Sequence, residues 1–203
     1  MKILCVILLC MSAPAFAGVS GSIGGVSNYV WRGVSQTGGS AAVQASLSAE
    51  AGGFYGSVWG SEVDFGDAIN AEVDIQIGFS AGDKIGIDVG AISYNYLDHY
   101  SADKRQNFLL QEDMREIYIG VFAGPVSATV YQETEEKERY YSLGVDVGQY
   151  LPIDVNLFAG EYEDSDTDYG VSVGKSWQNG IQLSYTYTYL EESEHSFGVF
   201  YNF

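Results

Sequence analysis

Apolar and polar residues alternate with a period of two along most of this chain. The pattern is clearest at residues 70–81, where Val73, Ile75, Ile77 and Phe79 alternate with acidic and amide side chains. Successive side chains of a β-strand point to opposite faces, so this pattern predicts strands with one apolar and one polar face. The chain is therefore predicted to be all-β.

The alternation recurs in segments that are separated by turn residues. The predicted strands are residues 18–34, 41–51, 54–65, 70–81, 84–97, 114–123, 126–133, 140–150, 153–161, 169–177, 181–190 and 196–203. An even number of antiparallel strands allows the sheet to close into a barrel with both chain termini on the same side of the membrane. Each membrane-spanning strand needs about 9–11 residues, and the predicted strands have about this length. The predicted fold is an antiparallel transmembrane β-barrel of about 12 strands.

The predicted connections fall into two alternating classes. Tight turns are predicted at residues 52–53, 82–83, 124–125, 151–152 and 179–180. Longer, mostly acidic loops are predicted around Asp67 and at residues 98–113, 133–139, 163–168 and 191–195. Outer-membrane barrels have short turns on the periplasmic side and longer loops outside, so this alternation favours such a barrel.

The first 17 residues have the pattern of an export signal. Lys2 precedes a short apolar run, and residues 15–17 form a small-x-small cleavage site. We expect cleavage after Ala17, leaving a barrel domain over residues 18–203. Cys5 and Cys10 would leave with the signal, so the mature chain would contain no disulfide.

Alternation alone does not decide which face of the sheet is inside. A soluble barrel or sandwich would bury the apolar face. A membrane barrel would turn the apolar face to lipid. The polar face is rich in Gly and Ser, which suits a crowded lumen, and Tyr and Trp recur near strand ends, as in an aromatic girdle. We therefore expect lipid outside.

With this orientation, the predicted lumen is strongly acidic. The predicted inward carboxylates are Glu50, Glu62, Asp64, Glu72, Asp74, Asp88, Glu116, Asp146 and Asp154. Arg32 is the clear inward cation, and we expect it to reach toward Glu62 or Asp64. Two interpretations remain open: a charged constriction that passes cations or small polar solutes, or an interior filled by ion-paired side chains.

Several segments resemble one bacterial family. These are SNYVWRGVSQT from Ser27, AVQASL from Ala42, GFYGSVWGSEVDF from Gly53, GAISYNYLD from Gly90 and EIYIGVFAGPVSATVY from Glu116. The chain resembles the TorF-type porins of the bacterial outer membrane. The resemblance implies an outer-membrane barrel and a passive pore, and it carries over no catalytic residues. A non-conducting structural or adhesive barrel is the alternative.

The last strand ends on Phe203, an aromatic carboxy terminus. This strand resembles the closing strand of outer-membrane barrels, where it also serves as an assembly signal. The resemblance implies that Phe203 is recognised by the barrel assembly machinery. Outer-membrane lipid and lipopolysaccharide are the other expected partners, together with small solutes or cations.

The remaining composition narrows the function classes. With 27 Asp and Glu against 9 Lys and Arg, the chain does not suit nucleic acid, which requires a basic surface. The two histidines, His99 and His195, lie on predicted loops. Asp98 and His99 beside Ser101 allow a hydrolase at the outer rim as an alternative, but their spacing is not diagnostic. We expect neither an enzyme nor a cofactor. We also expect no metal site, since no run matches a calcium-loop motif.

Overall fold

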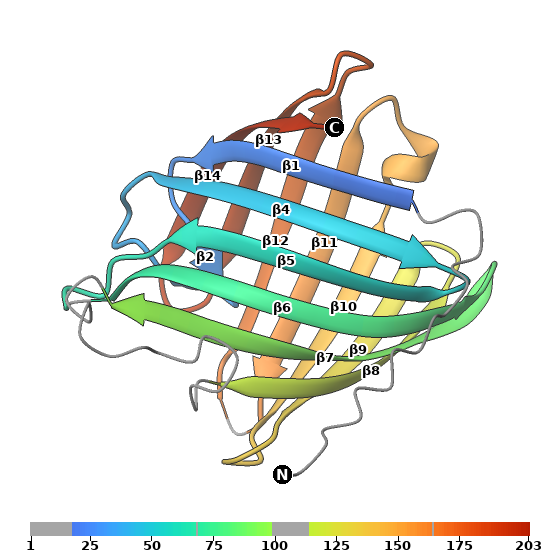
Figure 1. Cartoon of the computed structure of the whole chain (residues 1–203), viewed down its shortest axis with the longest axis horizontal. Coiled ribbons are helices and arrows are strands. Elements are labelled where there is room, and N and C mark those ends of the chain that lie inside the picture. The colour runs from blue at the N-terminus through green and yellow to red at the C-terminus, as the bar shows by residue number, and fades with distance from the viewer. Residues whose placement is uncertain (1–17, 68, 99–113, 164) are drawn as a thin grey trace, which may run out of the picture.

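A computed structural model describes residues 18–67, 69–98, 114–163 and 165–203. Within these residues, twelve antiparallel strands close into one barrel, in the order β1-β14-β13-β12-β11-β10-β9-β8-β7-β6-β5-β4 (Figure 1). The barrel strands are β1 (Gly18–Val26), β4 (Ala42–Ala51), β5 (Phe54–Glu62), β6 (Ile69–Gly82), β7 (Ile85–Asp98), β8 (Arg115–Ala123), β9 (Val126–Glu133), β10 (Arg139–Asp146), β11 (Asp154–Tyr162), β12 (Thr167–Ser176), β13 (Ile181–Tyr189) and β14 (Ser193–Asn202). The predicted fold is confirmed.

The barrel closes where β1 meets β14. Ser22 pairs with Asn202 there, and the backbone groups of Gly21 and Phe203 exchange two hydrogen bonds of 2.9 Å. We call the end of the barrel that carries the β4–β5 turn the turn end, and the end that carries the β1–β4 connection the loop end. The predicted signal peptide lies outside the described residues.

Several strand boundaries differ from the prediction, and three of them change the predicted elements or connections. The first strand ends at Val26 rather than at residue 34. β10 ends at Asp146, and a short 3-10 helix, η1 (Gly148–Tyr150), follows it, so the predicted tight turn at residues 151–152 is part of a longer connection. β14 already begins at Ser193, which shortens the predicted loop before it.

The outer surface of the barrel is apolar. Large aliphatic and aromatic side chains from every part of the sheet are exposed, among them Val19, Leu47, Ile77, Ile119 and Leu183. Water would make such a continuous apolar belt costly, whereas lipid accommodates it. The barrel is therefore a transmembrane barrel with its polar face inside. Among the described residues, no helix is long and apolar enough to cross a membrane.

The side chains of strand β5 face the opposite sides of the barrel wall from those predicted. The predicted inward phase of Glu62 and Asp64 would turn Tyr55 and Trp59 outward, but these two residues pair in register with Glu50 and Ser46 of β4 and point inward. Val58 points outward and is 46% exposed. Tyrosine and tryptophan combine an apolar ring with a polar group, so they suit a packed lumen as well as a membrane interface.

The long connection between β1 and β4 folds into the barrel instead of lying outside. It contains a two-stranded hairpin, β2 (Val30–Trp31) and β3 (Val34–Ser35), in which Trp31 pairs with Val34. Arg32 and Gly33 form the turn with φ of 46° and 84°, as a type I′ turn requires. Figure 1 shows β2 within the outline of the barrel, near the loop end. We call residues 27–41 the inserted hairpin.

Candidate functional site

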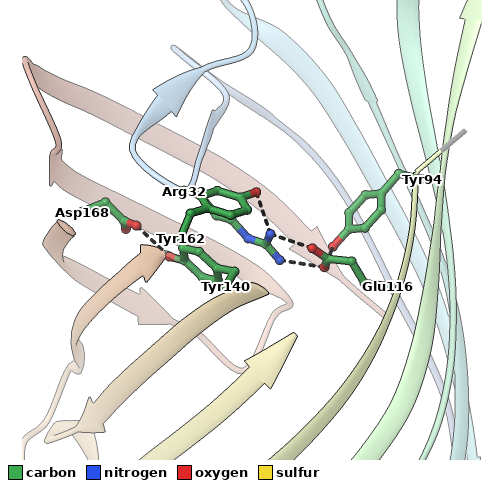
Figure 2. Close-up of polar contacts among 6 residues, drawn as sticks. All are labelled: Arg32, Tyr94, Glu116, Tyr140, Tyr162 and Asp168. Atoms are coloured by element: carbon green, nitrogen blue, oxygen red, sulfur yellow. Dashed lines mark hydrogen bonds and ion pairs between the residues drawn. The ribbon is translucent and has the colours of Figure 1, made fainter. Parts of the chain in front are cut away.

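Arg32 projects from the tip of the inserted hairpin to the opposite wall of the barrel. Its Nη1 and Nη2 atoms donate to the two carboxylate oxygens of Glu116 on β8, each at 2.7 Å. Nη1 also donates to the hydroxyl oxygen of Tyr162 on β11 at 2.7 Å. The Arg32 and Glu116 side chains are 8% and 2% exposed. Figure 2 shows this bidentate pair, with Tyr94 on the side of Glu116 and with Tyr140, Tyr162 and Asp168 on the side of Arg32.

Aromatic rings surround the Arg32 guanidinium. Its Cζ atom lies 4.0 Å from the ring centroid of Tyr140, 4.4 Å from Trp31 and 5.1 Å from Tyr131. The Tyr94 hydroxyl donates to Glu116 Oε2 at 2.9 Å, and Tyr140 donates to Asp168 Oδ1 at 2.8 Å. A guanidinium over aromatic faces gains cation–π energy that grows when water is excluded, so the pair is held on several sides.

Arg32 stays charged in this site. Burial lowers the pKa of the Arg32 guanidinium, but the hydrogen bonds and the charge of Glu116 outweigh burial and raise the pKa. A buried ion pair recovers its desolvation cost only when further hydrogen bonds satisfy its remaining atoms. Tyr94 and Tyr162 supply those bonds, and the pair therefore acts as a latch between the hairpin tip and the wall.

Other residues of the inserted hairpin contact the wall on the remaining sides. The Asn28 side-chain amide donates to Glu194 on β14 at 2.7 Å. The Tyr29 ring meets Trp59 of β5 edge-on at 5.1 Å, and the Trp31 ring meets Tyr94 of β7 at 5.7 Å. The hairpin thus crosses the lumen at the loop end and narrows it.

Gly33 fits a space that no side chain could share. A Cβ atom at Gly33 would lie 2.7 Å from Cβ of Leu190 and 3.0 Å from Cβ of Asp168. The positive φ also favours glycine here. The close approach fixes the hairpin tip against the connection between β13 and β14.

Two further carboxylates lie inward on β6 beneath the hairpin. Glu72 pairs in register with Ser61 and Tyr96, and Asp74 pairs with Trp59 and Tyr94, so both side chains share the inner face. Glu72 is 2% exposed. No hydrogen-bond partner within the described structure reaches Glu72 Oε2 or Asp74 Oδ1. Both oxygens are shielded from solvent.

The turn end is lined by a second, more open set of polar groups. Asp88 accepts a 2.7 Å hydrogen bond from the Tyr55 hydroxyl, which also contacts the hydroxyl of Tyr118. A cavity of about 300 Å³ lies at this end and includes Glu50 and Ser80 in its lining. Water therefore has room at the turn end.

The register places most of the predicted lumen residues on the inner face. They are Glu50, Glu72, Asp74, Asp88, Glu116, Asp146 and Asp154. Two predicted lumen residues are misplaced. Glu62 points outward because β5 has the opposite orientation. Asp64 follows the end of β5, where its exposed side chain accepts from the Gly66 backbone N–H at 3.0 Å.

The expected partner of Arg32 was also wrong, since Arg32 pairs with Glu116 and not with Glu62 or Asp64. Sequence reasoning missed Asp168 and Glu194 on the inner face, as well as the tyrosines around Arg32. Asp168 alternates with Gly170 and Ser172, and this phase could have revealed it. Whether the inward residues line a conducting path stays a prediction.

The candidate hydrolase group lies only in part within the described residues. His99 and Ser101 lie outside the described residues. His195 is on the outward side of β14, where its Nδ1 atom is 2.8 Å from the Tyr185 hydroxyl oxygen. His195 and Tyr185 thus belong to the outer surface rather than to the lumen.

A family model described as a bacterial protein of unknown function (Gcw_chp) matches residues 12–201. The chain belongs to this family. The description of the Gcw_chp family names no function, so the resemblance to TorF-type porins stays a prediction. A comparison with curated proteins found no match.

Two solved structures share the fold of this Gcw_chp chain. The KdgM porin matches with a TM-score of 0.65 at 9% sequence identity, covering 92% of this chain and 99% of that chain. The KdgM porin in complex with disordered oligogalacturonate matches with a TM-score of 0.66, with the same identity and coverage. At this identity the similarity establishes a shared barrel fold and nothing further.

Proposed function

We propose that this protein is a passive pore of the bacterial outer membrane that conducts small solutes and prefers cations. The observation that carries the proposal is the combination of an apolar outer belt with an acidic inner face. The inserted hairpin narrows the lumen at the loop end, and a cavity of about 300 Å³ lies at the turn end. The barrel fold shared with the KdgM porin supports the same proposal.

Charge on the inner face supports the preference for cations. The inward carboxylates of the barrel wall include Glu50, Glu72, Asp74, Asp88, Glu116, Asp146, Asp154, Asp168 and Glu194. Arg32 is held by Glu116 and compensates only part of this charge. A lumen of one sign between low-dielectric walls concentrates counter-ions and repels ions of like charge.

The same charge argues against an acidic solute. One KdgM structure contains an oligogalacturonate, whose uronate units are anions. Carboxylates along this lumen would repel such a chain. We therefore propose inorganic cations and small uncharged polar molecules as the solutes.

A non-conducting barrel is the second candidate, and the latch is the observation that favours it. Arg32 and Glu116 are buried, and the hairpin around them contacts strands on several sides of the lumen. If the hairpin never leaves this position, the barrel does not conduct and has a structural role. Single-channel recording in planar bilayers separates the two, because a permanently filled barrel gives no conductance steps.

Reversal potentials in a salt gradient test the cation preference. We expect wild type to favour potassium over chloride, and Glu72→Gln with Asp74→Asn to lower the permeability ratio several-fold, because two lumen charges are lost. Glu62→Gln is the matched control, since it removes a carboxylate from the outer face and should leave the ratio unchanged. Anion preference in wild type would overturn the proposal. So would equal potassium-to-chloride permeability ratios in the Glu72→Gln, Asp74→Asn double variant and in Glu62→Gln.

A further inference from the structure

Glu72 and Asp74 each place one carboxyl oxygen at a buried position without a partner in the described part of the chain. Glu72 Oε2 and Asp74 Oδ1 have no hydrogen-bond partner within the described structure, and both oxygens are shielded from solvent. The nearby buried cation, Arg32, is committed to both oxygens of Glu116. Burying an unpaired carboxylate is costly, so the two oxygens need either a proton or a cation.

Two tyrosine hydroxyls lie on one side of the Glu72 carboxylate. The hydroxyls of Tyr29 and Tyr96 hydrogen-bond to the Glu72 carboxylate. Hydrogen bonds donated to a carboxylate stabilise its ionised form. Glu72 thus has donors on one side and a free oxygen on the other, which is the arrangement of a carboxylate that also coordinates a cation.

We propose that Glu72 and Asp74 form a binding site for one divalent, oxygen-preferring cation such as Ca²⁺ inside the lumen. Two carboxylates balance the charge of one such ion. Residues two apart in a strand are separated by about 6.6 Å, a span that two carboxylates can bridge through one ion. The site deepens the proposed pore function and rests on it, because the ion must enter through the lumen.

The site binds its cation weakly. No group of three or more acidic, histidine or cysteine side chains in the described part of the chain is arranged to hold a metal. Ca²⁺ takes six to eight oxygen ligands, so water must complete the shell of a two-carboxylate site. Weak binding suits a conducting path, since a permeant ion must also leave.

Terbium luminescence tests the site directly in the refolded barrel in detergent, without any conductance measurement. Tb³⁺ replaces Ca²⁺ at oxygen sites and emits when a neighbouring indole transfers energy to it. Trp59 pairs in register with Asp74 and serves as the donor. We expect tryptophan-sensitised emission that CaCl₂ displaces, and a loss of at least tenfold in Glu72→Gln with Asp74→Asn.

Two controls separate this site from the exposed acidic loops. Trp59→Phe should remove at least half of the sensitised emission, and Glu50→Gln with Asp154→Asn at the turn end should retain it. As a second measurement, CaCl₂ at constant ionic strength should raise the melting temperature of wild type. Undiminished emission from Glu72→Gln with Asp74→Asn, or a wild-type melting temperature that does not respond to CaCl₂, would overturn the proposal, whatever the conductance.

Discussion

Replacing Arg32 with alanine is expected to raise single-channel conductance several-fold. The substitution removes the side chain that holds the hairpin tip to Glu116 and Tyr162, so the hairpin no longer stays across the lumen. It also leaves Glu116 buried without its partner, which should lower the free energy of unfolding by about 3–5 kcal/mol. Planar-bilayer recording and urea titration in lipid vesicles measure the two effects.

Arg139→Ala is the matched control for the latch. Arg139 forms a 3.5 Å ion pair with Glu163 at the same end of the barrel, but both side chains are about half exposed. Exposed pairs contribute about 0–1 kcal/mol, so this variant should resemble wild type in both measurements. An Arg32→Ala protein with wild-type conductance would show that the hairpin does not limit the pore.

A charge on the outer face at mid-barrel is expected to be as damaging as the loss of the latch. Val58 lies in the middle of β5 and points outward. Val58→Lys should lower the free energy of unfolding in lipid by about 2–4 kcal/mol, because lysine at the bilayer midplane is poorly solvated. Urea titration in vesicles and the shift in gel mobility on heating report the folded fraction.

The neighbouring residue provides the control for Val58. Ser57 points inward by its pairing with Ser48 and Gln76. Ser57→Lys introduces the same charge into a polar, acidic lumen, and the loss of stability should be well below that of Val58→Lys. Equal losses at the two positions would contradict the assignment of the faces of β5.

The period of the strands could be read from the sequence, but the phase of β5 could not. In β8 the aliphatic residues Ile117 and Ile119 mark the outer face, and Glu116 therefore lies on the inner face, as predicted. In β5 the outer face carries Phe54, Val58 and Glu62 besides two glycines, while Tyr55 and Trp59 lie inside. Aromatic residues with a polar group suit both sides of a barrel wall, so their presence does not decide the phase.

The inserted hairpin was missed because its residues continue the alternation of β1. Only Gly33 marks the turn, and Arg32 before it replaces the Asn or Asp that usually precedes glycine in such turns. The latch joins residues 84 positions apart in the chain. Arg32 meets Glu116 because β8 lies across the barrel from the hairpin tip. Local sequence patterns do not indicate which strand lies at that place.

The most direct test locks the hairpin to the wall in the absence of Arg32. Asn28→Cys and Glu194→Cys replace the two side chains that join the hairpin to β14 by a 2.7 Å hydrogen bond, and a short bis-methanethiosulfonate reagent can cross-link the two thiols through reducible disulfides. Residues 18–203 contain no other cysteine. In the Arg32→Ala background, the cross-linked protein should show wild-type conductance, and reduction should raise it to the Arg32→Ala level. Equal conductance before and after reduction of a verified cross-link would contradict the claim that the inserted hairpin constricts the pore.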